Sequence, residues 1–336
     1  MKNILLFHKV PLAITLLAWL WVGWALGTTA FFLVIVLSIL EITLSADNAV
    51  VNSRVLVKMS ELWQKLFLTV GIFIAVFLIR FILPIVIVAV AAGMSMSDVT
   101  MLAINNPDEY GKKLHQVAPI IDGFGGMFLF MVATFFFVNV ARSHFWMEDA
   151  ERFLSKFAKV PHIKVAVIIL LYISIIALLP TDLKIPVGVS MGLAIFIYSF
   201  LHTVTVLMEK LQNRNEAKKQ VGWVAFGSFL YLEVLDASFS LDGVVGAFAL
   251  TNNIVIIMIG LGIGALWVRT LTLHMVKHNV LGQYRFLESG AHWAILFLST
   301  IMFLKLFHIE LPEVIVGLVG LICIIASIYS SYKKRR

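Results

Sequence analysis

The sequence predicts an all-α polytopic membrane protein with about ten transmembrane helices, arranged as a 5+5 inverted-topology repeat. Three observations predict this fold class. Hydrophobic residues make up 61% of the 336-residue chain and charged residues only 13%, which is far from the composition of soluble domains. Runs of roughly 20 apolar residues recur along the chain, each long enough to cross a hydrocarbon core of about 30 Å. Two of these runs also contain acidic stretches that read as copies of each other.

The apolar runs are expected to be helices, because a segment inside a bilayer must satisfy its own backbone hydrogen bonds. The short alternating segments typical of a transmembrane barrel are absent from the sequence. We expect spans near 11–27, 30–52, 66–92, 122–141, 164–180, 185–208, 222–249, 252–276, 291–307 and 312–331. The segments between them are too short for a second domain, so residues 1–336 form a single membrane domain.

The first expected span follows Lys2 and Lys9. Basic residues before an apolar run are also typical of a secretory signal peptide. Its apolar stretch is long, and no clear Ala-x-Ala cleavage site follows it. These flanks favour a retained helix over a cleaved signal.

The basic residues test this order of spans. If these spans cross the membrane in turn, most of the 26 Lys and Arg residues fall on one side of the membrane. Arg80 and Arg269 lie inside spans. The opposite side holds only Lys112, Lys113, Lys184 and Lys305. Such an imbalance places the basic side, with both termini, in the cytoplasm. The pI of about 9.4 therefore reflects topology, and no nucleic-acid partner is expected. Cys323 is the single cysteine, which excludes an internal disulfide and a thiolate metal cluster.

Two acidic pairs lie in the second and seventh spans. Glu41 is followed six residues later by Asp47, and Asp236 six residues later by Asp242; a Val-Val pair follows each. A carboxylate at bilayer depth costs roughly 3 kcal/mol on insertion scales. Four such residues in two matched places indicate a functional site.

The two halves match beyond these pairs. In the same order follow a Gly-x8-Arg segment (Gly71 to Arg80, and Gly260 to Arg269) and a looser match between Asp122-Gly-Phe-Gly and Glu288-Ser-Gly-Ala. The first half covers about 11–180 and the second about 185–331. Repeats with an odd number of spans must be inverted relative to each other, and such transporters bind substrate near the midplane.

Convergence of the acidic residues requires broken helices. Six residues correspond to about 600° and roughly 9 Å of α-helix, so Glu41 and Asp47 would not share a face. The segments 44–48 and 242–243 contain poor helix formers. We therefore predict local breaks near Ser45–Asp47 and near Asp242–Gly243.

Oxygen donors in these positions suit Mg²⁺, Ca²⁺ or Mn²⁺. The candidate metal ligands are Glu41, Asp47, Asn48, Glu233, Asp236 and Asp242. Arg80 and Arg269 would balance their charge. A candidate proton relay comprises Asp122, Glu288 and His292, and protonatable carboxylates would suit proton coupling. No permanently bound cofactor is expected, since the cation is the substrate.

The segments around Glu41–Val50 and Asp236–Val244 resemble the acidic motifs of the TerC family of bacterial integral membrane proteins. The longer chain is similar to the DUF475 branch of that family. The resemblance runs from the second to the ninth span, and it implies a bacterial cytoplasmic (inner) membrane protein of the metal-ion exporter superfamily. Mn²⁺ is the substrate that this resemblance implies. The second copy departs from the motif, because Gly243 stands where the first copy has Asn48.

The sequence thus predicts a secondary transporter that exports a hard divalent cation, and not an enzyme. The sequence contains no glycine-rich nucleotide-binding loop, so transport driven by ATP hydrolysis is not expected. One alternative is an accessory membrane protein that hands metal to exported proteins or supports resistance to tellurite or membrane stress. A further alternative is an intramembrane aspartyl protease, which needs two carboxylates sharing a proton. Single carboxylates such as Asp47 and Asp242 could instead cap helices or form structural ion pairs. The expected partners are the lipid bilayer, the cation, and a second copy or another membrane protein.

Overall fold

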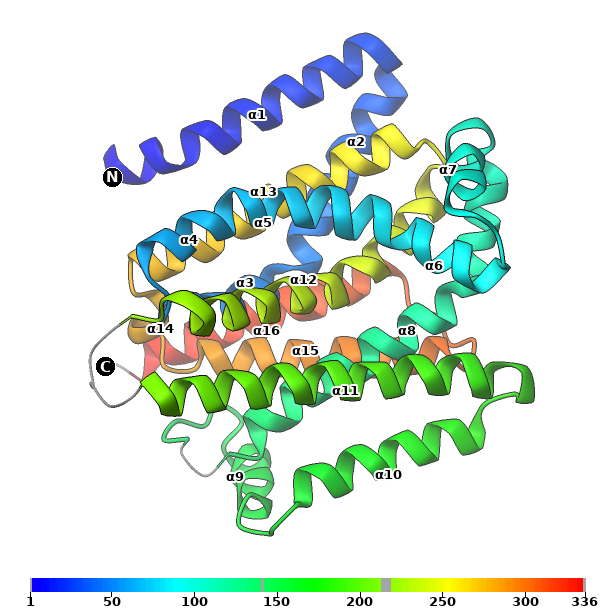
Figure 1. Cartoon of the computed structure of the whole chain (residues 1–336). Helices are drawn as coiled ribbons and strands as arrows, with labels where there is room; N and C mark the ends of the chain where they lie inside the picture. Colours follow the sequence, from blue (N-terminus) through cyan, green and yellow to red (C-terminus); the bar gives the residue numbers. More distant parts are fainter. Residues whose placement is uncertain (1, 140–141, 213–218, 335–336) are drawn as a thin grey trace.

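The protein is a bundle of long helices, seen here in a computed structural model that describes residues 2–139, 142–212 and 219–334 (Figure 1). Within these ranges no β-strand forms, and the single β-bridge joins Met59 to Gln220. The predicted all-helical, polytopic membrane fold is therefore confirmed.

The helices follow one another with short connections. The first half contains α1 (Lys2–Leu26), α2 (Thr28–Leu44), α3 (Ala46–Leu56), α4 (Glu61–Leu68), α5 (Val70–Phe73), the π-helix η1 (Ile74–Ile82), α6 (Leu83–Ala92), α7 (Met96–Asn105), α8 (Pro107–Phe137), α9 (Glu148–Phe157) and α10 (Ile163–Leu178). The second half contains α11 (Thr181–Gln212), α12 (Gly222–Leu250), α13 (Ile254–Lys277), α14 (Val280–Gln283), α15 (Leu287–Lys305) and α16 (Glu313–Lys333).

Eight helical segments in the described residues are long and apolar enough to cross a membrane, or up to nine if the bent pair α2 and α3 is one span. The fifth expected span, 164–180, corresponds to α10, whose 16 residues are fewer than the roughly 20 that a full crossing needs. Side chains such as Trp24, Leu170 and Leu178 project outward from the peripheral helices α1 and α10. A surface of this kind fits contact with lipid tails.

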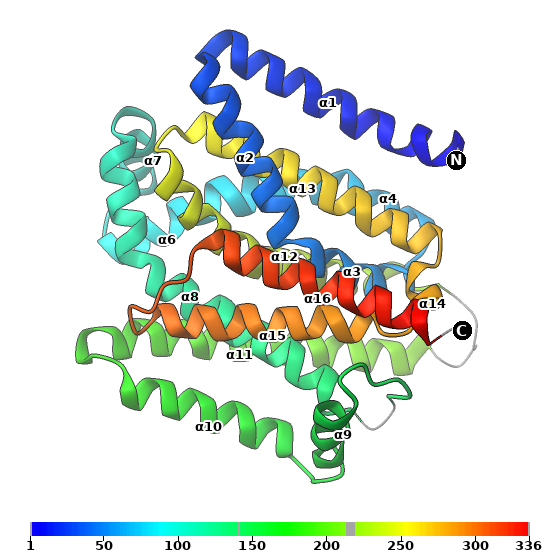
Figure 2. The ribbon, with the colours of Figure 1, turned by 180° about the vertical axis from the view of Figure 1, so that it is seen from behind.

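Both chain termini lie at the same end of the bundle, in agreement between two opposite views (Figures 1 and 2). We call this end the terminal end. It also carries the start of α15, because Arg285 donates a hydrogen bond to the carbonyl of Lys334. The loop from α15 to α16 lies at the opposite end. The common position of the termini agrees with the topology expected from the basic residues.

The predicted break in the first acidic segment is confirmed. Helices α2 and α3 meet at Ser45 and are bent by 53° relative to each other. The Ser45 hydroxyl donates a hydrogen bond to Glu41 Oε1 at 3.2 Å. Serine and aspartate side chains compete for local hydrogen bonds and so weaken a helix at this point.

The predicted break in the second acidic segment is wrong. Helix α12 runs without interruption from Gly222 to Leu250, through Asp242 and Gly243. A glycine inside a helix costs only about 1 kcal/mol, which the packing of a buried helix easily offsets. A Cβ atom at Gly243 would lie 3.1 Å from Glu41 Oε2, so this helix passes close to the first acidic residue without unwinding.

The fourth expected span begins earlier than 122, because α8 starts at Pro107. Asn106 caps this helix by accepting a hydrogen bond from the Glu109 backbone N–H, and proline is favourable at the first helical position. Part of the segment 93–121, between the third and fourth expected spans, is therefore helical. The end of that span, residues 140–141, lies outside the described residues.

The acidic helices pack crosswise between the halves. Helix α2 packs on α13, and α12 packs on η1. Each acidic helix thus contacts the arginine-bearing segment of the other half. Helix α1 lies against α2 and α13, where Trp267 donates a hydrogen bond to the Thr15 hydroxyl at 2.9 Å.

Candidate functional site

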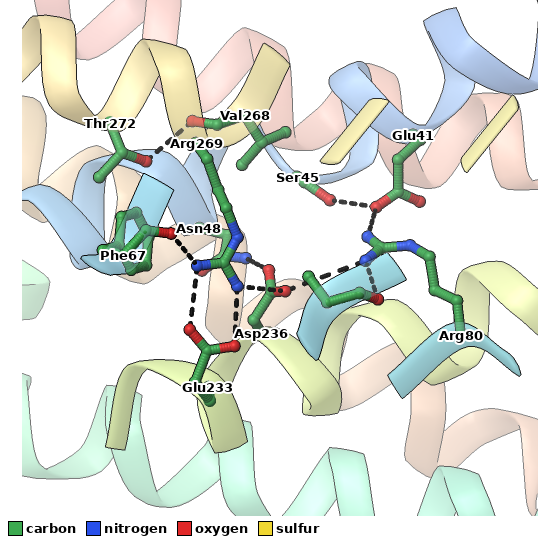
Figure 3. A network of polar contacts seen from close by, with 11 residues as sticks. Glu41, Ser45, Asn48, Phe67, Arg80, Glu233, Asp236, Val268, Arg269 and Thr272 are labelled. Atoms are coloured by element: carbon green, nitrogen blue, oxygen red, sulfur yellow. Dashed lines mark hydrogen bonds and ion pairs between the residues drawn. The ribbon is translucent and has the colours of Figure 1, made fainter. Parts of the chain in front are cut away.

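A buried ion-pair network lies at the centre of the bundle, where α2, η1, α12 and α13 meet (Figure 3). Its charged members are Glu41, Arg80, Glu233, Asp236 and Arg269, none more than 5% exposed. Three carboxylates and two guanidinium groups therefore share one interior site. All five residues were candidate site residues in the sequence, and the structure brings them together.

Arg269 of α13 is the most firmly held of these groups. Its Nη1 and Nη2 donate to Glu233 Oε1 and Oε2 at 3.0 and 2.9 Å, and Nη2 also donates to Asp236 Oδ2 at 3.2 Å. The Phe67 carbonyl accepts a further bond at 3.1 Å, and the Phe67 ring lies under the guanidinium at 4.2 Å. Such a bidentate, stacked arrangement is specific to arginine.

Arg80 reaches the network from the π-helical segment η1. Its Nη2 donates to Glu41 Oε1 at 2.5 Å, and its Nη1 donates to the carbonyl of Ala75 at 2.8 Å. Asp236 Oδ2 lies 4.0 Å from Nη1. π-Helical turns are rare and are frequent at functional sites.

Asp236 connects the two arginines to the broken helix. The Asn48 amide of α3 donates to Asp236 Oδ1 at 2.9 Å, while Oδ2 faces Arg269 and Arg80. The Asn48 side-chain oxygen is buried and has no hydrogen-bond partner among the described residues. Asp236 is thus bound to Asn48 of the first half and to Arg269 of the second.

Asp47 stands apart from this network. It is buried, and its carboxylate accepts a hydrogen bond from the Asn48 backbone N–H at 3.0 Å. In the described part of the chain no ion pair joins it to an arginine, and it interacts electrostatically with the Cys323 thiol on α16. The side chain of Asp242 lies outside the described residues. The roles predicted for these two aspartates stay predictions.

The arginines occupy the carboxylates in this structure. The described residues contain no group of three or more His, Cys, Asp or Glu side chains arranged to hold a metal ion. Because the Asp242 side chain lies outside them, the convergence of all the predicted carboxylates stays a prediction. Formally, three negative charges face two positive charges, so the network keeps an excess of one negative charge.

Two cavities flank the network along α12. The first, of about 230 Å³ at the terminal end, is lined by Ser228 and Tyr231 of α12 and by Val51 and Arg54 of α3. The second, of about 660 Å³ at the opposite end, is lined by Val245 and Gly246 of α12 and by Leu40 of α2. The ion pairs lie between them, since Glu233 and Asp236 fall between these residues along α12.

The candidate relay residues lie beside the cavities and not in the network. Asp122 lines the second cavity. Glu288 forms an ion pair with Arg54. His292 lines the first cavity, where its ring stacks on Phe136 at 3.6 Å and its Nδ1 is hydrogen-bonded to the Glu288 carbonyl oxygen at 2.8 Å. The structure therefore separates Asp122 from the other two residues.

A further buried carboxylate, Glu151 of α9, was not predicted. It pairs with Arg142 and accepts hydrogen bonds from Ser289 at 3.2 Å and from Trp293 at 2.9 Å. This contact fixes the 142–157 segment to the start of α15. Its sequence resembles an ordinary charged loop, so only the tertiary structure identifies it.

Two glycines allow the network to close. A Cβ atom at Gly264 of α13 would lie 2.3 Å from Glu41 Cγ, and one at Gly71 would lie 2.4 Å from Arg269 Nη1. Only a residue without a side chain permits these approaches. Gly71 belongs to the Gly-x8-Arg match between the halves, and this match is the sequence feature that could have indicated its close contact. No sequence pattern marks Gly264.

Replacing Gly264 with alanine is expected to destabilise the protein by about 1–3 kcal/mol, since the added methyl group overpacks Glu41. Thermal unfolding in detergent measures the effect. Gly192→Ala is the matched control, because nothing lies within 4 Å of a Cβ there and alanine is the better helix former. Equal unfolding temperatures for the two variants would contradict the predicted close contact.

The fold and the site define a class: a polytopic membrane protein with a buried arginine–carboxylate network between two cavities. The chain belongs to the DUF475 family, described as a protein of unknown function, whose sequence model matches residues 46–336. Glu41 precedes the matched range, whereas Asp236 and both arginines lie within it. Searches of the curated proteins and of the solved structures gave no match.

Proposed function

We propose that this protein is a secondary transporter that exports a hard divalent cation, with Mn²⁺ as the substrate, across the bacterial cytoplasmic membrane. One observation carries the proposal: buried carboxylates lie between two cavities along α12, one beside α3 and the other beside α2. Ionisable groups at such depth in a membrane protein mark substrate pathways. Both termini would lie in the cytoplasm.

The chemistry of the donors supports a hard cation. Glu41, Asp236 and the Asn48 amide offer only oxygen atoms for coordination, and Mg²⁺, Ca²⁺ and Mn²⁺ prefer such ligands. Arg80 and Arg269 balance the charge when the substrate is absent. The excess negative charge would attract a cation into the site.

The bent helix supports alternating access. Transporters place discontinuous helices at their midplane sites and expose the site to each side in turn. The break at Ser45 separates Glu41 from Asn48 and leaves both next to α12. A change of the bend there would open the site toward one cavity and close it toward the other.

The family resemblance names the substrate within this chemistry. The acidic motifs resemble those of TerC proteins, and that resemblance implies Mn²⁺ export, with proton coupling through the protonatable carboxylates. An accessory role in metal delivery or stress resistance would use the same carboxylates. A protease needs two carboxylates sharing a proton, whereas Asp236 is bound to Arg269, and this favours the transporter.

The proposal predicts Mn²⁺ flux by the full-length protein in proteoliposomes under a proton gradient. Asp47→Asn is expected to lower this flux, because it removes a buried carboxylate that has no arginine partner in the described structure. Total cellular metal, measured by mass spectrometry in a deletion strain, should rise for Mn²⁺ and return to normal with the wild-type gene. Full flux by the Asp47→Asn protein would remove Asp47 from the site, and no Mn²⁺ or Ca²⁺ flux by the wild-type protein would refute export.

A further inference from the structure

The two arginines of the network are held in different ways. Arg269 makes four hydrogen bonds to other elements: three to the carboxylates of Glu233 and Asp236 and one to the Phe67 carbonyl. Among the described side chains, Arg80 makes one such bond, to Glu41, since its second acceptor is Ala75 of its own π-helical segment. Arg269 is therefore fixed from several sides, whereas a single hydrogen bond to the described part of the acidic helices holds Arg80.

The position of Arg80 matches that of a bound cation. Its guanidinium lies between Glu41, at 2.5 Å, and Asp236, at 4.0 Å (Figure 3). These carboxylates come from the two acidic segments that match each other in the sequence. The unpartnered side-chain oxygen of Asn48 belongs to a residue bound to the same Asp236. With Arg80 removed, oxygens from α2, α3 and α12 would be available for coordination.

We infer that Arg80 is a displaceable internal cation: its guanidinium occupies the substrate position between Glu41 and Asp236, and the divalent cation binds there by displacing it. Arg269 stays bound to Glu233 as a permanent counter-ion. The inference rests on the proposed function and assigns different roles to two arginines that the sequence repeat makes equivalent.

Competition of this kind lowers the apparent affinity for the cation, because only the fraction of molecules with Arg80 withdrawn can bind it. The same competition speeds release, since the returning guanidinium compensates the carboxylates as the cation leaves. A transporter needs both properties, because a cation held by uncompensated carboxylates would dissociate slowly.

Mn²⁺ binding to the purified full-length protein in detergent, measured by calorimetry, tests the inference. Arg80→Gln is expected to bind Mn²⁺ at least tenfold more tightly than the wild-type protein and to transport it more slowly. Arg152→Gln is the matched control, because that arginine pairs with Glu148 at the surface. It should leave both quantities unchanged.

A second measurement separates displacement from a general gain in negative charge. In Arg80→Ala, added methylguanidinium should compete with Mn²⁺ and weaken its binding, whereas it should have no effect on the wild-type protein. The Arg80→Lys variant keeps the charge and serves if the shorter variants fail to fold; it should bind Mn²⁺ more tightly than wild type, since lysine cannot bridge Glu41 and Ala75 as arginine does.

Two results overturn the inference while leaving export intact. The first is that the wild-type protein transports Mn²⁺ while every Arg80 variant that folds binds Mn²⁺ with the wild-type affinity. The second is methylguanidinium that fails to compete in Arg80→Ala. If the wild-type protein neither binds nor transports Mn²⁺, the proposed function itself fails, and this inference fails with it.

Discussion

Replacing Arg269 with methionine is expected to cost about 3–5 kcal/mol of stability, because it leaves a buried carboxylate pair without its cation. Arg269 is 1% exposed and binds both Glu233 and Asp236. Methionine keeps much of the side-chain volume. The loss of stability therefore reflects the missing charge and hydrogen bonds more than a cavity. Thermal unfolding of the detergent-solubilised protein should show a markedly lower midpoint than wild type.

A second substitution tests the cause. Adding Glu233→Gln to Arg269→Met removes the carboxylate that had two bonds to the guanidinium, and should recover part of the lost stability. Arg152→Met is the surface control and should have almost no effect, since exposed ion pairs contribute about 0–1 kcal/mol. An equal midpoint for Arg269→Met and Arg152→Met would show that the network does not stabilise the bundle.

Asp236→Asn is expected to have the largest effect on transport. Asparagine has the same shape but lacks the charge that Arg269, Asn48 and the proposed cation share at this position. We expect Mn²⁺ flux in proteoliposomes to fall by about 10–100-fold, in the range seen when groups that support a metal site are removed.

The matched control is Asp182→Asn, because Asp182 is an exposed carboxylate in the first turn of α11. It should transport Mn²⁺ at the wild-type rate. The unfolding midpoint of Asp236→Asn is measured in parallel, so that a loss of flux is not confused with a loss of folding. Wild-type flux by a folded Asp236→Asn protein would exclude Asp236 from the transport site.

Hydrophobic length and charge placement made the fold class predictable. Apolar runs near 20 residues specify membrane helices by their own burial, and the structure contains helices at all of the expected positions. The start of α8 was missed because the cap at Asn106 and the proline that follows are local signals within a polar stretch. The shortness of α10 was missed because its apolar run continues past the helix end at Leu178.

The membership of the network was also predictable, because a charged residue inside an apolar run is costly and so is conspicuous. Glu41, Asp236 and both arginines could be found in this way. Their pairing could not, since four or more charges on separate helices can be connected in several ways. The break at Ser45 and the continuity of α12 illustrate the same limit, because similar weak helix formers gave opposite results.

The sequence by itself thus determined that this chain is a helical membrane protein with charged groups buried in two matched segments, because hydrophobic burial and the cost of buried charge depend on each residue's own chemistry. Only the tertiary structure decided that Arg269 is fixed by Glu233, Asp236 and Phe67, that Arg80 is held to Glu41 by one hydrogen bond, and that Asp47 stands apart. These outcomes depend on how helices distant in sequence pack, where a glycine such as Gly264 decides how closely two backbones approach.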